Sequence, residues 1–133
     1  MIVLDSSAIV AVILREADAP ALEKILILEN CVVGAPTLVE TRMVLEGRMS
    51  SGAADLLQSL VAERGIAIIP FDAAMYAAAV EAFARYGRGR HRAKLNFGDC
   101  LSYAVAAVMR LPLLFKGDDF VHTDIVPAYT PVP

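Results

Sequence analysis

The chain has little of what several kinds of functional site require. Its 133 residues include two cysteines, two histidines and no tryptophan. Cys31 and Cys100 lie in apolar surroundings without the CxxC or Cys/His spacing of a zinc site, so we interpret both as reduced core residues. His91 and His122 show no spacing suited to a pair of acid–base catalysts. Soft-metal chemistry and histidine-based catalysis are therefore disfavoured.

Membrane-spanning and secretory features are also missing. No uncharged apolar run approaches the roughly 20 residues that cross a bilayer, and the first residues lack the basic flank and cleavage site of a signal peptide. We expect a soluble, cytoplasmic protein with no membrane partner. The length predicts a single domain over residues 1–133, with an exposed C-terminal tail from about residue 127.

Positive charge is scarce except in one segment. The net charge is -3, which gives no overall basic footprint for nucleic acid. One stretch, RYGRGRHRAK, has five cations and no acid, namely Arg85, Arg88, Arg90, Arg92 and Lys94. It is either a nucleic-acid contact or a solvated basic loop. The apolar fraction of 57% indicates a large core or a surface reserved for a partner.

Strand-like and helix-like segments alternate along the chain. The short apolar segments typical of strands are Ile2–Leu4, Cys31–Val33, Ile66–Ile69 and Leu113–Phe115. The helical stretches are Ser7–Leu14, Pro20–Leu28, Leu38–Arg48, Gly52–Arg64, Ala73–Tyr86 and Gly98–Arg110. Pro20 suits a first helical turn, Asp72 an N-cap and Gly65 a C-terminal cap. This alternation predicts an α/β fold with a mainly parallel sheet and helices on both faces.

Acidic residues stand where the expected strands end and the helices begin. They are Asp5, Glu40, Asp99 and the adjacent pair Asp118 and Asp119. Taken singly, each could stabilise a helix N-terminus by roughly 0.3 to 1 kcal/mol. Thr37 to Glu40 has the T-x-x-E form of a capping box, and Asn96 can cap a helix that carries Asp99 in its first turn.

The same acids can also form one site. In a parallel sheet, the carboxyl ends of strands and the N-termini of helices share one edge, where ligands bind. Two carboxylates about 4 Å apart repel each other by about 4 kcal/mol at an effective dielectric constant of about 20. Proton uptake or a hard divalent cation would relieve that repulsion. Because the donors are oxygen atoms, the pattern favours Mg²⁺ or Mn²⁺.

The segments that carry these acids resemble a known family. IVLDSSAI, APTLVETR, LNFGDCLSYA and LLFKGDDFVHTDI, in this order, resemble the PIN-domain ribonucleases, specifically the VapC toxins of type II toxin–antitoxin systems. The match runs from Ile2 to about Ile125. It implies a PIN-like three-layer α/β sandwich and an Mg²⁺-dependent endoribonuclease that hydrolyses RNA with a metal-activated water, Mn²⁺ being able to substitute. The number of metal ions is left open.

The resemblance implies which residues of this sequence form the site. The catalytic and metal-binding acids are Asp5, Glu40, Asp99 and Asp119. Asp119 fits the fourth motif better than Asp118, which stays an alternative. A hydroxyl near the first acid is also typical, and here it belongs to Ser6 or Ser7, either of which could instead cap the helix.

Other residues around the motifs have two interpretations each. Arg42 either tethers Glu40 or contacts substrate. Phe97 and Tyr103 flank Asp99, and core packing is favoured over stacking on a base. The basic segment Arg85 to Lys94 would bind the RNA backbone. The resemblance further implies a VapB-type antitoxin partner and a homodimer.

Two rival functions remain. A non-catalytic binding module on the same fold would use the acids only as caps. An aspartyl-phosphate enzyme would use Asp5 as a nucleophile, but the second acid typical of such sites is missing, since Ser7 stands two residues on.

Overall fold

The computed structural model describes residues 1–131 and forms one parallel sheet flanked by helices. The strands lie in the order β3-β2-β1-β4. They are β1 (Ile2–Leu4), β2 (Cys31–Gly34), β3 (Ala67–Ile69) and β4 (Leu113–Leu114). The helices are α1 (Ser6–Ile13), α2 (Ala19–Leu28), α3 (Ala35–Arg48), α4 (Ala53–Glu63), α5 (Ala73–Tyr86) and α6 (Phe97–Met109).

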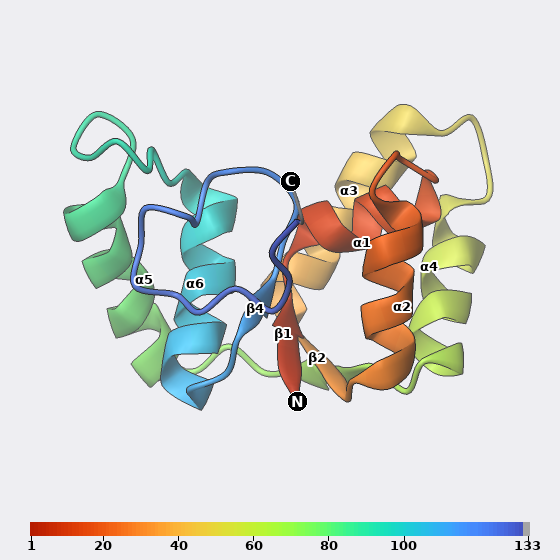
Figure 1. The fold of residues 1–133 in the computed structure, drawn as a ribbon, viewed down its shortest axis with the longest axis horizontal. Helices are drawn as coiled ribbons and strands as arrows, with labels where there is room; N and C mark the ends of the chain where they lie inside the picture. Colours follow the sequence, from red (N-terminus) through yellow and green to blue (C-terminus); the bar gives the residue numbers. More distant parts are fainter. Residues whose placement is uncertain (132–133) are drawn as a thin grey trace.

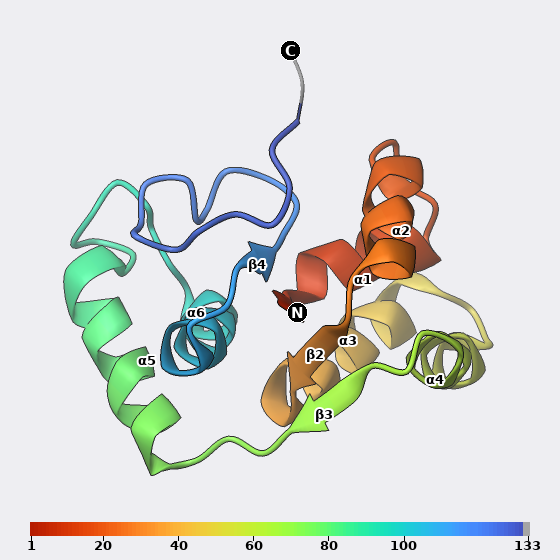
Figure 2. The same ribbon diagram turned by 60° about the horizontal axis from the view of Figure 1, so that its bottom comes forward.

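Side chains of successive strand residues enter two different cores. Ile2 and Leu4 belong to the core that contains residues of α1 to α4, whereas Val3 belongs to the core that contains residues of α5 and α6. This alternation is the two-residue period of a strand. Figure 1 accordingly shows α5 and α6 on one side of the strands and α1 to α4 on the other. Figure 2 shows β3 and β4 at opposite edges, so the three-layer α/β sandwich is confirmed.

The order of the strands reverses at β1. The chain passes from β1 to β2 and β3 on one side, and then returns to place β4 on the other side of β1. In open parallel sheets the crevice beyond such a reversal is the usual ligand site, because neighbouring connections leave in opposite directions there. Asp5 follows β1 directly, and Lys116 to Asp119 follow β4.

Most local signals act as the sequence predicts. The Asp72 carboxylate accepts a hydrogen bond from the Met75 N–H at 2.9 Å and caps α5. Gly65, with φ of 59°, follows the C-terminus of α4. Pro20 lies in the first turn of α2. These residues confirm the expected helix ends.

The capping box proposed for Thr37 to Glu40 is wrong. Helix α3 starts at Ala35, directly after β2, and Gly34 is its N-cap without a side-chain hydrogen bond. Thr37 is therefore already inside the helix, and its hydroxyl faces Ser102 of α6 instead of a free N–H group. Because β2 runs straight into α3, the helix gains a first turn that the sequence assigned to a loop.

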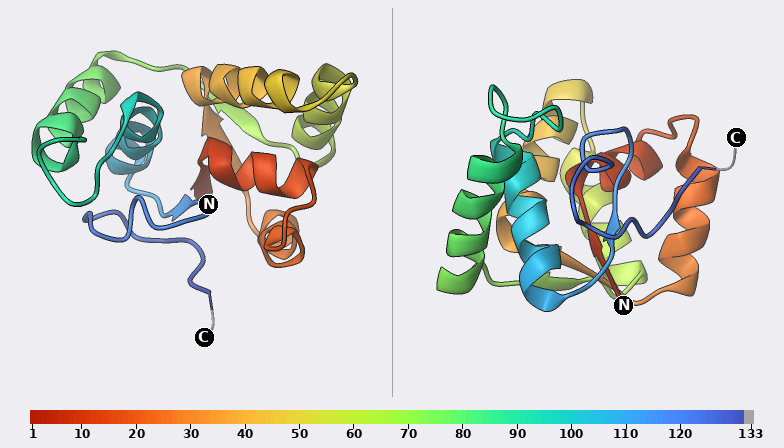
Figure 3. Two further views of the ribbon diagram at one scale, coloured as in Figure 1. Left: turned by 90° about the horizontal axis from the view of Figure 1, so that it is seen from above. Right: turned by 60° about the vertical axis from the view of Figure 1, so that its left-hand side comes forward.

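The C-terminal segment is less exposed than expected. Pro127 pairs with Leu113 of β4, and the Ala128 N–H donates to the Leu113 carbonyl at 2.9 Å. Ala128 and Tyr129 pack against the core. Pro127 itself is exposed, as are Thr130 and Pro131, whereas Ala128 and Tyr129 are half-buried. Residues 132 and 133 of the expected tail lie outside the described part. Figure 3 shows this segment returning along β4. Within residues 1–131, no helix is both long and apolar enough to cross a membrane.

Candidate active site

Asp5 is a buried carboxylate fixed by serine hydroxyls. It is 4% exposed and is the N-cap of α1. Its Oδ2 accepts hydrogen bonds from the Ser7 N–H at 3.1 Å and from the Ser7 hydroxyl at 2.5 Å. Its Oδ1 accepts one from the Ser102 hydroxyl at 2.5 Å. The carboxylate is thus both the helix cap and a member of a wider polar cluster.

The two serines connect Asp5 to other elements. The Ser7 hydroxyl accepts a hydrogen bond from the Lys116 N–H at 3.0 Å, just after β4. Ser102 lies 3.4 Å from the Thr37 hydroxyl of α3. The sequence interpretation missed Ser102, although it follows Asp99 by three residues and so lies on the same face of α6.

Asp99 lies in the first turn of α6, where it forms the capping box that the sequence predicts. Its N–H donates to the Asn96 Oδ1 at 2.9 Å, and its Oδ2 accepts from the Asn96 N–H at 3.0 Å. Burial raises the pKa of Asp99 to about 7, although the Asn96 hydrogen bond opposes the shift. Repulsion from Asp5, Asp119 and Glu40 raises it further. The four acids therefore interact electrostatically.

Glu40 approaches α6 at a residue without a side chain. The Glu40 carboxylate lies where a β-carbon on Gly98 would stand. Burial raises the pKa of Glu40, a hydrogen bond from the Ser6 side chain lowers it, and the charge of Asp5 raises it again. Ser6 thus acts on Glu40, and Ser7 acts on Asp5.

Asp119 is the member of the adjacent pair that interacts with the cluster. Burial raises its pKa, the charges of Asp5 and Asp118 raise it further, and Arg88 lowers it. Asp118 is exposed. The structure therefore brings Asp119 towards Asp5 and Asp99, with Asp118 beside it.

The donor set suits a hard cation, although it does not form a closed ligand shell. Among residues 1–131, no group of three or more Asp, Glu, His or Cys side chains has the geometry of a metal site. Burial raises the pKa of Asp99 most, and the charges of Asp5, Asp119 and Glu40 raise it further, so negative charge gathers at this site. Oxygen donors and gathered negative charge fit Mg²⁺ or Mn²⁺.

The basic segment forms an ordered loop. Gly87 and Leu95 pair at its base, and Arg88, Arg90, Arg92 and Lys94 are exposed along it. Because Arg88 lowers the pKa of Asp119, one end of the loop adjoins the acidic cluster. Arg85 differs from the others, since it contacts Asp124 at 3.9 Å and lies over the ring of Tyr86.

Arg42, Tyr103 and Phe97 each had two interpretations in the sequence, and their contacts bear on the choice. Arg42 donates to Glu46 at 2.8 Å in an exposed ion pair, so it does not tether Glu40. Tyr103 is buried, as expected, and donates to Asp124 at 2.6 Å. Phe97 is 79% exposed, so the expectation of core packing is wrong for this residue. It is the first residue of α6, and the neighbouring turn places Gly98 rather than Phe97 inward.

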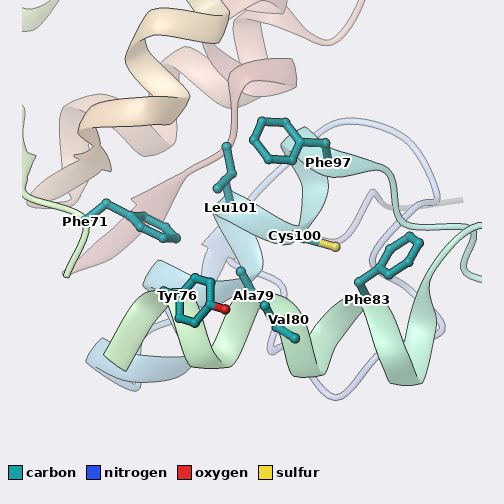
Figure 4. A pocket seen from close by; sticks show the side chains of 8 residues that line it. All are labelled: Phe71, Tyr76, Ala79, Val80, Phe83, Phe97, Cys100 and Leu101. Carbon is teal, nitrogen blue, oxygen red and sulfur yellow. The ribbon is translucent and has the colours of Figure 1, made fainter. Parts of the chain in front are cut away.

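Phe97 forms part of an apolar hollow between α5 and α6. Figure 4 shows Phe97, Cys100 and Leu101 of α6 facing Tyr76, Val80 and Phe83 of α5 across it. Its volume is about 420 Å³. A second hollow, lined by Val39, Met43 and Val61 among others, lies between α3 and α4. Apolar surface of this kind is typical of partner contacts.

Comparison with known proteins gives the family of the chain. Residues 2–126 match the PIN domain model. Ribonuclease VapC42 of Mycobacterium tuberculosis is 42% identical over 130 residues, covering 96% of this chain and 99% of the relative. The fold matches the crystal structure of Mycobacterium tuberculosis VapC20, a sarcin-ricin loop cleaving toxin, with a TM-score of 0.79 at 19% identity over 98% of this chain and 100% of that one.

A second solved structure has the same fold. It is a toxin–antitoxin complex from Klebsiella pneumoniae, with a TM-score of 0.68 and 17% identity, covering 93% of each chain. The sequence match over nearly the whole chain, together with the acidic cluster at the reversal of strand order, agrees with the resemblance carried by the four motifs. The chain therefore belongs to the PIN-domain family and, within it, to the VapC ribonucleases.

Proposed function

We propose that this chain is the toxin of a type II toxin–antitoxin pair and that it hydrolyses RNA at the acidic cluster. The observation that carries the proposal is the convergence of four acids from separate segments, Asp5, Glu40, Asp99 and Asp119. The charges of the other three raise the pKa of Asp99. The relatives named ribonucleases share about 40% of the sequence over most of the chain. One domain over residues 1–133 carries the activity.

The acids hold a divalent cation, Mg²⁺ or in its place Mn²⁺. Asp5 and Asp99 are the principal ligands, and Glu40 and Asp119 complete the set directly or through water. The chemistry that a bound cation would supply is a water of lowered pKa for attack on the phosphodiester and positive charge to offset the phosphate oxygens. Without the cation, Asp99 would ionise only as the pH rises through about 7, since burial and the neighbouring acids raise its pKa to about 7.

The RNA backbone lies along the exposed cations of the loop, Arg88, Arg90, Arg92 and Lys94. Arg85 is already engaged with Asp124 and Tyr86, so it contributes less than the other four. Such phosphate contacts position the strand without selecting its sequence. Ser6, Ser7 and Arg42 are candidate substrate contacts: Ser6 bonds to Glu40, Ser7 bonds to Asp5, and Arg42 follows Glu40 by two residues.

The partners are a VapB-type antitoxin and a second copy of this chain. Two apolar hollows on different pairs of helices support two protein contacts. The toxin–antitoxin complex that shares the fold supports the first partner. We place the protein in the cytoplasm, where its RNA substrate is found.

Replacing single acids tests the proposal. Asp5→Asn or Asp99→Asn should abolish RNA cleavage and growth inhibition, because each removes a charged oxygen ligand while keeping the shape of the side chain. Cleavage by the parent protein should stop in EDTA and return with Mg²⁺ or Mn²⁺. The measurements are a gel assay of RNA cleavage and the growth of cells expressing each variant, with circular dichroism to check folding.

Two results would contradict the proposal. A folded Asp99→Asn protein that remains fully toxic would remove the acids from the mechanism. Undiminished cleavage in chelator would exclude the cation. No cleavage together with no metal binding by calorimetry would instead favour the non-catalytic binding module, in which the acids serve only as caps.

A further inference from the structure

The hydrogen bonds to Asp5 leave its two oxygens unequal. A carboxylate has about four acceptor positions, two on each oxygen. Oδ2 already accepts from the Ser7 N–H and from the Ser7 hydroxyl. Oδ1 accepts only from Ser102. One acceptor position on Oδ1 therefore remains for another group.

We propose that Oδ1 is the atom through which Asp5 binds the cation, and that Ser102 is the positioning residue that aims it. The inference rests on the proposed function, since it specifies how one acid of that site is used. Ser102 does not touch the substrate or replace a ligand. It acts through Asp5 by fixing the rotation of the carboxylate, which Ser7 holds from the other side.

The direction of the hydrogen bonds supports an orienting role. An ionised carboxylate only accepts, so Ser102 must donate its one hydroxyl proton to Asp5. The Ser102 oxygen can then accept a proton from the Thr37 hydroxyl at 3.4 Å. Thr37 and Ser102 are both 1% exposed, so water cannot readily replace either contact. The two hydrogen bonds therefore run in one sense, with Thr37 donating to Ser102 and Ser102 donating to Asp5.

Ser102 also couples two of the acids. It lies one turn after Asp99 on the same face of α6. Its hydrogen bond to Asp5 therefore fixes the first acid of the chain relative to the helix that carries the third. Residues that orient metal-binding side chains in this way typically change metal affinity by about 10- to 100-fold when they are mutated.

The test compares the Mn²⁺ affinity of Ser102→Ala with that of the parent protein, measured by the electron paramagnetic resonance signal of free Mn²⁺. We expect the dissociation constant to rise about tenfold in the variant. In the cleavage assay, the Mn²⁺ concentration that gives half the maximal rate should rise by the same factor, and the rate at saturating Mn²⁺ should fall much less.

Thr41→Val is the matched control. Thr41 is as buried as Ser102 and its hydroxyl donates to the Thr37 carbonyl at 2.7 Å, so the variant loses a buried hydroxyl that does not touch a carboxylate. Its Mn²⁺ affinity should equal that of the parent. If Ser102→Ala does not fold, Ser102→Cys keeps the volume and weakens the donor, and the same rise is expected.

Two outcomes overturn the inference. A Ser102 variant that binds Mn²⁺ within about twofold of the parent shows that Ser102 does not aim the ligand, because oriented ligands lose more than this. An equal loss in Thr41→Val shows only general destabilisation. A parent protein that binds no Mn²⁺ would contradict the proposed function itself, and so the two failures are distinguishable.

Discussion

At the residue scale, Gly98 controls how closely Glu40 approaches α6. A β-carbon there would overlap the Glu40 carboxylate, which is the mobile end of a long side chain. Gly98→Ala should therefore displace Glu40 at little cost in stability and reduce RNA cleavage at least about tenfold, a loss of roughly 1.4 kcal/mol in transition-state stabilisation. Cleavage rates and thermal unfolding of the variant measure both effects.

Gly47 offers a matched control on α3. A β-carbon there meets nothing within 4 Å, so Gly47→Ala should keep full activity and stabilise the helix by roughly 0.5 to 1 kcal/mol. Equal activities of the two variants would show that Glu40 does not need its place beside Gly98.

Asp99 makes the stability of the metal-free protein depend on pH. Folding raises the pKa of Asp99 to about 7, so the folded state binds this proton more tightly than the unfolded chain. The stabilisation is fully present at acidic pH, below the unfolded pKa, and is lost as the pH rises through about 7. In EDTA, the ionisation of Asp99 should make the free energy of unfolding about 1 kcal/mol lower at about pH 8 than at about pH 6.

Asp99→Asn isolates this contribution, because the amide cannot ionise. The variant should gain stability relative to the parent, and the gain should be larger at pH 8 than at pH 6. Urea unfolding in chelator measures it. A gain that is the same at both pH values would mean that Asp99 titrates outside this range.

At the scale of single elements, the first turn of α6 both starts the helix and holds one of the four proposed catalytic acids. Asn96→Ala removes the acceptor of the Asp99 N–H. It should cost about 1 kcal/mol of stability, as the loss of an N-cap does, and should also reduce cleavage because Asp99 loses its fixed turn. Thermal unfolding and cleavage rates are measured on the same preparation.

Asp72→Ala is the control for this cap. It removes the equivalent hydrogen bond from the Met75 N–H at the start of α5 and should cost a similar free energy. Because the α5 cap does not carry an acid of the cluster, cleavage should persist. Parallel losses of cleavage in the two variants would attribute the effect to stability alone.

Element ends were predictable where the signal is local. Asp72, Gly65 and Asn96 satisfy backbone groups within a few residues of themselves, so their effect depends little on the rest of the chain. The capping box at Thr37 failed because its outcome depends on how β2 joins α3. Because α3 already begins at Ala35, the N–H three residues after Thr37 can bond to a carbonyl within the helix and needs no side-chain cap.

At the scale of the whole molecule, an acidic protein must bind RNA through a local patch. The net charge is -3, and in the proposed function the basic loop beside Asp119 would supply the counter-charge for phosphate. Replacing Arg88, Arg90 and Arg92 together by Ala should weaken RNA binding and reduce the slope of log affinity against log salt by about 2, as expected for three lost phosphate contacts on a single strand. Fluorescence anisotropy over a salt series measures the slope.

An Asp99→Asn background prevents cleavage during this titration, and the same change is made in the loop variant. A triple variant that keeps the slope of its parent would make the loop ordinary solvated surface. Loss of cleavage without a change in slope would instead place the effect of the arginines at the acidic cluster.

The sequence by itself predicted the α/β class and most of the strand and helix positions, and it named the four acids as candidates. These follow from residue periodicity and from motifs, which are properties of neighbours along the chain. Only the tertiary structure shows that the Ser102 hydroxyl donates to Asp5 and that the Glu40 carboxylate lies against Gly98. Ser102 and Asp5 are separated by 97 positions. Such contacts depend on how α6 packs beside β1, which no local pattern encodes.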